Sequence, residues 1–374
     1  MTTLLVGVGV ALLVGVVVLE IALRLYAGSN PAFLARLRSQ DILAVKVEPM
    51  GDFGFRQKPN TFLRYENGTI ANANSLGYRG PEVSCEKPKG TTRIVLVGGS
   101  STYGWGVEDD QTLDEYMRQE LSTRYPGRRF EVVNLAFDGY DSFQDYERIR
   151  IEGLGYQPDV IVVNNGINDV RNARYPDLQD PDPRTLLWRD LVGALRAQAA
   201  RGGPDFKSRL KHGFYSLQFV ASVRGDWEGQ KLLTARGLPE QPEPNPEAFD
   251  YFERNIRRIA TLANEAGVAL LLSTSPSSIR TKYPPDARSP RDYWIGDAAA
   301  TQKLREEIDR RMRRVAADLQ ATQPVRYVDH TVPASMFLDD AHLTPEGNQA
   351  LARAFCDGMG SWIDATIAAS APQT

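Results

Sequence analysis

Hydrophobic positions follow two different patterns along this chain of 374 residues. Met1 to Leu19 contain no charged side chain, and the apolar character continues beyond Glu20 to Leu23. From Thr91 onward, short apolar runs alternate with longer amphipathic stretches. Buried strands that alternate with helices are typical of a parallel sheet covered by helices on both faces. The pattern therefore predicts an apolar N-terminal segment and a large α/β domain.

The second pattern sets the expected elements. The apolar runs predict five strands, at 93–98, 130–135, 159–163, 269–273 and 325–328. The intervening stretches predict helices at 113–124, 141–152, 250–266, 298–320 and 345–369, and the last of these has a proline in its first turn. These elements predict an α/β domain over 91–374.

The N-terminal segment has the length of a membrane anchor. Some twenty apolar residues at a rise of about 1.5 Å each span the hydrocarbon core, so we expect one transmembrane helix over 1–26. A cleaved signal peptide is the alternative, although no Lys or Arg precedes the apolar run and no A-x-A site follows it. Gly7, Ala11 and Gly15 fall four apart, a spacing that would let two such helices approach and dimerise.

The sequence leaves the orientation of this helix open. Arg24, Arg36 and Arg38 follow it and would hold that side in the cytoplasm, yet large domains translocate despite such charges. Our working expectation is a single-pass protein with its large domain outside the cytoplasm.

Two further segments complete the organisation. Residues 27–90 are rich in turn-forming residues, and we interpret them as an arm with a short strand or two. Residues 171–248 interrupt the strand–helix alternation and contain a helix-like stretch at 185–199 and a proline-rich run at 237–248. This insertion has two interpretations, a lid over a site or a surface decoration.

Composition narrows the chemistry. Lys and Arg number 44 against 47 Asp and Glu, a net charge of −3 that gives no support to nucleic-acid binding. Two cysteines, Cys85 and Cys356, cannot form a disulfide framework or a four-cysteine zinc site, and whether they pair depends on the compartment. With only three histidines, at 212, 330 and 342, we expect neither a protein-bound metal nor a cofactor.

Candidate chemistry gathers where the predicted strands end. The four segments are GGSSTYG at 98–104, NLAFDGYDS at 134–142, NNGIND at 164–169 and DDAHLTPEG at 339–347. Loops at the carboxyl ends of parallel strands meet at one edge of a sheet. No lysine of a phosphate-binding loop is present, so the glycine–serine turn does not indicate a nucleotide site. Together the segments supply a serine, amide donors, a histidine and a carboxylate, which is the inventory for acyl transfer.

These four segments, in this order, resemble the sequence blocks of the SGNH (GDSL-type) esterases and lipases. The resemblance covers 91–369 apart from the insertion, and it implies a three-layer, flavodoxin-like α/β/α fold with a five-stranded parallel sheet. It also implies Ser100 as nucleophile, His342 as general base and Asp339 as the group that orients the imidazole. The implied oxyanion hole consists of the backbone N–H groups of Ser100 and Gly139 and the side chain of Asn168. The arm and anchor resemble membrane-attached members of this family.

One departure and several competitors stand beside this assignment. Gly99 occupies the position where the family usually has an aspartate. Ser101 adjoins the candidate nucleophile, and Asp340 adjoins the candidate orienting acid. The pair Asp329 and His330 follows the fifth predicted strand and is an alternative source of the base.

We therefore expect a membrane-anchored serine ester hydrolase whose substrate is an ester, in particular an O-acetylated carbohydrate. An acyltransferase to a polysaccharide would use the same residues. A lipase or lysophospholipase is a further alternative, in which the apolar helix at 185–199 would contact lipid. A carbohydrate-binding scaffold without catalysis is the alternative from another class, and it predicts an incomplete triad.

Overall fold

The computed structural model describes residues 2–30, 47–50, 54–65, 67–174, 196–197, 200, 213–223, 244–288 and 295–369. Its centre is a five-stranded sheet whose neighbouring strands are all parallel. The strands are β5 (Thr91–Gly98), β6 (Arg129–Asn134), β7 (Val160–Asn165), β8 (Ala269–Thr274) and β9 (Val325–Tyr327). Their order in the sheet is β6-β5-β7-β8-β9.

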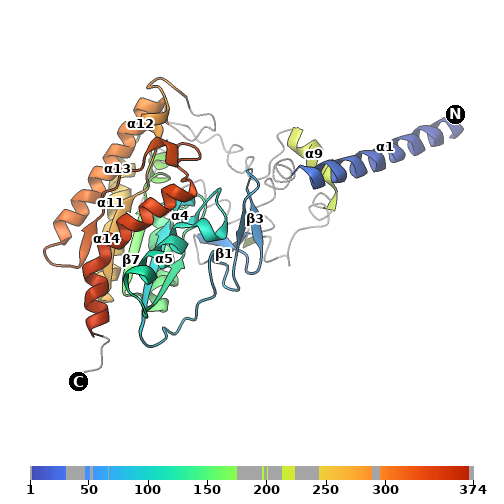
Figure 1. The fold of residues 1–374 in the computed structure, drawn as a ribbon. Coiled ribbons are helices and arrows are strands. Elements are labelled where there is room, and N and C mark those ends of the chain that lie inside the picture. Colours follow the sequence, from blue (N-terminus) through green and yellow to red (C-terminus); the bar gives the residue numbers. More distant parts are fainter. Residues whose placement is uncertain are drawn as a thin grey trace.

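Helices cover both faces of this sheet (Figure 1). On one face lie α5 (Leu113–Arg124) and α14 (Pro345–Ala369). On the other lie α6 (Ser142–Ile151), α11 (Glu247–Glu265) and α13 (Ala298–Leu319). Along β5, Ile94 and Leu96 face the first pair of helices, whereas Val95 and Val97 face the second group. Side chains alternate across a strand, so an uninterrupted apolar run is the mark of a strand buried on both faces.

The three-layer α/β/α fold is thus confirmed, and the predicted strands and helices of the main domain lie within a few residues of the observed ones. Short helices fill the loops: α4 (Ser100–Tyr103), α12 (Ile279–Lys282), and single 3-10 turns at Asp109–Gln111, Gly153–Tyr156, Asp169–Arg174 and Ala334–Met336. The predicted helix at 185–199 and most of the insertion lie outside the described residues.

The arm forms two small antiparallel sheets. One pairs β1 (Val47–Met50) with β2 (Gly54–Gln57), and the other pairs β3 (Phe62–Arg64) with β4 (Ile70–Asn72). Their apolar side chains pack on residues that follow β5 and β6, among them Tyr103, Phe137 and Tyr140. The arm therefore covers the carboxyl ends of β5 and of the edge strand β6.

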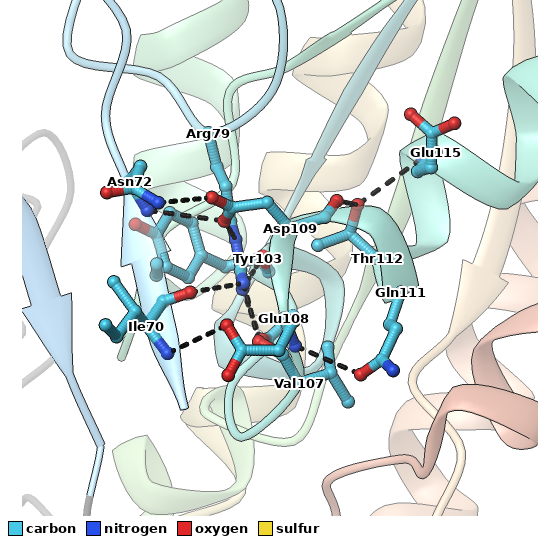
Figure 2. A network of polar contacts seen from close by, with 12 residues as sticks. Ile70, Asn72, Arg79, Tyr103, Val107, Glu108, Asp109, Gln111, Thr112 and Glu115 are labelled. Carbon is cyan, nitrogen blue, oxygen red and sulfur yellow. Dashed lines mark hydrogen bonds and ion pairs between the residues drawn. The ribbon is translucent and has the colours of Figure 1, made fainter. Parts of the chain in front are cut away.

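A buried arginine ties this arm to the loop after α4 (Figure 2). The Arg79 side chain is fully buried, and its Nε lies 2.8 Å from Asp109 Oδ1. The guanidinium also donates hydrogen bonds to four backbone carbonyl groups, those of Ile70, Tyr103, Gly104 and Val107. Every direction of the guanidinium fork is used, so one side chain fixes β4 against the 103–107 loop.

Arg79→Met is expected to lower the free energy of unfolding by about 3–5 kcal/mol, because methionine leaves the carbonyl groups and the Asp109 carboxylate without their donor. Urea unfolding of the full chain measures this. The matched control is Arg129→Met, whose ion pair with Glu131 involves an arginine side chain that is 63% exposed, and a change below about 1 kcal/mol is expected there. Equal free energies of unfolding for the two variants would show that the buried Arg79 contacts stabilise the fold no more than the exposed Arg129 ion pair does.

The N-terminal helix α1 (Thr2–Ser29) projects away from the domain, with α9 (Tyr215–Val223) beside its C-terminal end (Figure 1). Glu20 of α1 accepts hydrogen bonds from the backbone N–H groups of Tyr215 and Ser216, at 3.0 and 2.8 Å. Arg24 lies 2.8 Å from the same carboxylate. In the part of the chain that the structure describes, no helix combines the length and the apolarity needed to cross a membrane.

Candidate active site

The nucleophile loop is built on two glycines. β5 runs into Gly98 and Gly99, and Ser100 begins the short helix α4. A Cβ atom on Gly98 would lie 2.3 Å from the backbone oxygen of Asn164, and one on Gly99 would lie 2.6 Å from Asn168 Nδ2. Neither position has room for a side chain. A side chain at position 99 would therefore require the Asn168 amide to move.

Ser100, His342 and Asp339 meet in one chain of hydrogen bonds, although Ser100 and His342 are 242 positions apart. The Ser100 Oγ lies 2.8 Å from His342 Nε2, and His342 Nδ1 lies 2.7 Å from Asp339 Oδ2. The imidazole and the carboxylate are 14% and 19% exposed, which leaves the triad shielded but within reach of a substrate. Nucleophile, base and orienting group in this order can perform acyl transfer.

Asp339 is held as an anion in a fixed orientation. Its Oδ1 accepts hydrogen bonds from the backbone N–H groups of Ala341 and His342, at 2.9 and 2.8 Å. Burial opposes its ionisation, but the hydrogen bond and charge of His342, together with the two N–H groups, outweigh burial and hold the pKa of Asp339 well below its usual value. A carboxylate can only accept, so Nδ1 carries the proton and the Nε2 lone pair faces Ser100.

The three expected oxyanion donors are the backbone N–H groups of Ser100 and Gly139 and the Asn168 side chain. Gly139 has a φ of +81°, a left-handed conformation that favours glycine. Within the described residues, the backbone N–H groups of Ser100 and Gly139 donate to no acceptor. Asn168 Nδ2 donates one hydrogen bond to the Tyr140 carbonyl at 2.8 Å, and its second hydrogen has no acceptor within the described residues. These donors are free for the charge that develops on a carbonyl oxygen.

The Asn168 loop is fixed by its neighbour in the chain. Asp169 is buried and accepts from the Ser142 backbone N–H at 3.1 Å and from the Ser142 hydroxyl at 2.5 Å. Burial, together with the nearby Asp141, raises the pKa of Asp169 well above its usual value. This contact joins the loop after β7, which carries Asn168, to the start of α6, which follows Gly139 in the chain.

The competing residues have other partners. Ser101 is buried, and its hydroxyl donates to the Ala341 carbonyl at 3.1 Å. His330 Nε2 donates to the Thr274 carbonyl at 2.7 Å, and Asp329 forms an ion pair with Arg313 at 2.8 Å. Asp339, and not Asp340, contacts the His342 imidazole.

Sequence reasoning missed three residues beside His342. The Trp105 ring lies over the imidazole at a centroid distance of 4.3 Å, and Tyr65 of the arm lies 5.4 Å from Trp105. The Tyr65 hydroxyl donates to Asp138 Oδ2 at 3.1 Å. Burial raises the pKa of Asp138 to about 6, against the opposing effects of His342 and Tyr65. Asp138 directly precedes Gly139, so its place in the sequence could have indicated that it lies near the site. Nothing in the sequence around Tyr65 indicates this for Tyr65.

Metal and disulfide chemistry have no visible site in the described ranges. No group of three or more His, Cys, Asp or Glu side chains there is arranged to hold a metal ion. Cys85 is exposed, Cys356 is buried, and both are free thiols. The expectation that the enzyme needs no cofactor stays a prediction.

The fold and the site define the class: an α/β hydrolase for carboxylic esters, with a serine, a histidine and an aspartate in hydrogen-bonded sequence. The chain belongs to the GDSL-like lipase/acylhydrolase family, whose family model matches residues 96–350. The resemblance of the four sequence blocks is thereby confirmed. The catalytic roles of individual residues, and the boundaries of anchor, arm and insertion, stay predictions.

Solved structures with a similar fold come from several bacteria. An acetylxylan esterase from Geobacillus stearothermophilus is 15% identical, with a TM-score of 0.40, and the match covers 73% of this chain and 97% of that one. A lipase/acylhydrolase from Enterococcus faecalis is 14% identical, with a TM-score of 0.39 and coverages of 72% and 96%. A GDSL-like lipase from Bacteroides thetaiotaomicron is 15% identical, with a TM-score of 0.40 and coverages of 72% and 88%. No curated protein matches the chain significantly.

Proposed function

We propose that this ester hydrolase removes O-acetyl groups from a carbohydrate through an acyl-enzyme. The observation that carries the proposal is the group formed by Trp105, Tyr65 and Asp138 next to His342. In a serine hydrolase the base returns its proton to the leaving oxygen, so the alcohol part of the substrate lies on the histidine side. The partly exposed Trp105 ring offers a surface for the apolar face of a sugar, and the Asp138 carboxylate can accept from its hydroxyls, while the buried Tyr65 supports both.

The proposed mechanism assigns each group a step. The Ser100 Oγ attacks the acetyl carbonyl carbon while its proton passes to His342 Nε2. The oxyanion accepts hydrogen bonds from the N–H groups of Ser100 and Gly139 and from Asn168 Nδ2. When the carbon–oxygen bond to the sugar breaks, the proton on Nε2 passes to the leaving oxygen. Water then attacks the acyl-enzyme, again with His342 as base, and acetate leaves.

The test compares esters with the purified full chain. A mono-O-acetylated monosaccharide and nitrophenyl acetate are expected to release acetate faster than a nitrophenyl decanoate or a lysophospholipid is cleaved. Asp138→Asn is expected to slow the sugar ester more than nitrophenyl acetate, because only the sugar presents hydroxyl groups. Preferential cleavage of the long-chain esters would overturn the carbohydrate assignment.

Product analysis separates the alternatives that share the triad. Acetate in water indicates hydrolysis, whereas an acetylated product that appears only with an added oligosaccharide acceptor indicates transfer. Absence of any adduct with a fluorophosphonate probe would instead favour a binding protein.

We further propose that α1 attaches the enzyme to a membrane, with the hydrolase domain outside the cytoplasm. Support comes from apolar side chains of α1 that are at least half exposed, namely Val10, Leu13, Val14, Val16, Val17, Val18, Ile21 and Leu25. Such a row is costly in water. Glu20 and Arg24, the charged residues within this helix, neutralise each other.

Membrane fractionation of cells that produce the full chain tests this attachment. The double variant Val14→Lys/Val18→Lys is expected to move into the soluble fraction, whereas Gln119→Lys/Thr123→Lys on the exposed face of α5 is expected to stay with the membrane. A reporter fused to the C-terminus tests the orientation. Equal partitioning of both variants would overturn the anchor, and activity of a cytoplasmic reporter would overturn the orientation.

A further inference from the structure

A second cavity lies at the same edge of the sheet as the triad but does not include it. Its volume is about 320 Å³, within the range of small-molecule sites. It is lined by residues that follow β7, β8 and β9 and by one face of α13, while Ser100 and His342 are not among them. Ligands of open parallel sheets bind beyond the carboxyl ends of the strands, and this cavity has that location.

A buried cation without a direct counter-charge faces this cavity. Arg305 of α13 donates through Nη2 to the Ser275 carbonyl at 2.6 Å, and its Nη1 is buried and makes no hydrogen bond within the described chain. No carboxylate of the described residues lies within ion-pair distance of it, although Asp340 and Asp309 act on it from farther away. Burial lowers the pKa of Arg305 to about 10 against these charges. A buried, half-satisfied guanidinium is costly unless a ligand completes it.

Three carboxylates line the cavity, those of Glu306, Asp309 and Asp329, and each is already engaged. Glu306 accepts a hydrogen bond from Gln302 Nε2 at 3.1 Å. Asp309 lies 2.7 Å from Arg313 Nε and accepts from the Thr274 hydroxyl at 2.6 Å. Asp329 lies 2.8 Å from Arg313 Nη2. Arg313 is therefore paired with Asp309 and Asp329. Arg280 also lines the cavity but is exposed to solvent, so Arg305 is the cation of the cavity wall that an incoming anion would meet.

A second buried atom without a hydrogen-bond partner lies in the wall of the same cavity and could bind the other end of a ligand. His330 lines the same cavity, and its Nε2 donates to the Thr274 carbonyl at 2.7 Å, so that Nδ1 is an acceptor in the neutral ring. This Nδ1 is buried and has no partner within the described residues. Burial lowers the pKa of His330 in spite of the Thr274 hydrogen bond, and the neighbouring Arg305 charge lowers it further. The cavity thus offers one cationic donor and one neutral acceptor.

We propose that this cavity binds a hydroxylated carboxylate, such as a sugar acid, through its carboxylate on Arg305 Nη1 and a hydroxyl on His330 Nδ1. A carboxylate without a hydroxyl group, such as acetate, suits the pair less well, because it has no hydrogen to give to His330. The site adjoins the triad: the Ser277 and Ser278 hydroxyls beside the cavity donate to the Asp340 and Asp339 carbonyls, at 2.9 and 2.8 Å. The proposal does not depend on ester hydrolysis.

Calorimetric titration of the full chain with glucuronate at neutral pH tests the site without any activity readout. Binding is expected, with glucose, which lacks the carboxylate, binding at least tenfold more weakly. Arg305→Met is expected to weaken glucuronate binding by about 10- to 100-fold, the range for loss of a charged hydrogen bond. Arg310→Met is the matched control on the same helix, since the Arg310 side chain is 71% exposed, and it is expected to bind like the wild type.

His330→Gln provides a second variant should Arg305→Met fold poorly, because glutamine can still donate to the Thr274 carbonyl but lacks the ring acceptor. It is expected to weaken glucuronate while leaving acetate binding close to its original level. Absence of glucuronate binding at millimolar concentration, equal binding by wild type and both variants, or a preference for inorganic phosphate would each overturn the proposal. A cavity filled by water alone gives the first of these results.

Discussion

Ser100→Ala is expected to lower kcat for nitrophenyl acetate by about 10⁶-fold, because the substitution removes the hydroxyl that we propose attacks the acyl carbon. The Ser100 Oγ lies 2.8 Å from His342 Nε2, and no other hydroxyl of the described residues contacts that nitrogen. A residual rate above that in water would remain, since the oxyanion donors do not depend on the serine side chain. Initial rates and labelling by a fluorophosphonate measure the effect.

Ser101→Ala is the matched control for this substitution. Its hydroxyl holds the Ala341 carbonyl at 3.1 Å, so we expect a loss of about 1 kcal/mol in stability but continued labelling of Ser100. Labelling that persists in Ser100→Ala and disappears in Ser101→Ala would show that Ser101, and not Ser100, is the nucleophile.

Asp339→Asn is expected to lower kcat by about 10⁴-fold while KM changes little. The asparagine oxygen can still accept the hydrogen bonds from the backbone N–H groups of Ala341 and His342, and this places the NH₂ group against His342 Nδ1. That contact favours the tautomer with the proton on Nε2, and this nitrogen can then no longer accept the Ser100 proton. Measurement of kcat and KM with one ester distinguishes this loss from a binding defect.

The same substitution has a second consequence, for stability. The folded-state pKa of Asp339 lies below its unfolded value, so its contribution is present above about pH 4 and is lost as pH falls through the folded-state pKa. Asp339→Asn should remove this acid dependence, whereas Asp340→Asn should retain both the dependence and the activity. Full activity of Asp339→Asn would contradict the triad.

Much of the fold could be predicted because each strand of the main sheet is marked by its own short stretch of sequence. A strand such as β7 is buried on both faces, so its sequence is an unbroken apolar run, and turn-forming residues bound it. The bounds of α5 and α14 agree with prediction because Thr112 caps the first helix and Pro345 starts the second. The arm resisted prediction, since its strands are three or four residues long and gain stability only from packing on Tyr103, Phe137 and Tyr140.

The residues of the site also fall into two groups, those that the sequence predicted and those that it did not. Ser100, Gly139, Asn168 and His342 each follow a strand, and the parallel sheet brings the ends of its strands to one edge whatever the connections between them. Tyr65 and Arg305 follow no sheet strand of this kind. Tyr65 reaches the histidine side because the arm folds back over β6, and Arg305 reaches the second cavity from the middle of α13.

The sequence by itself therefore determined the alternation of strands and helices, the family and the chemistry at the strand ends, because these depend on periodicity and on short motifs. Only the tertiary structure showed that the imidazole contacts Ser100 and Asp339, as the resemblance had implied, and that Arg305 and His330 line one cavity. The physical reason is that a hydrogen bond requires an approach to about 3 Å. Between residues separated by tens or hundreds of positions, only the packing of whole elements sets such a distance.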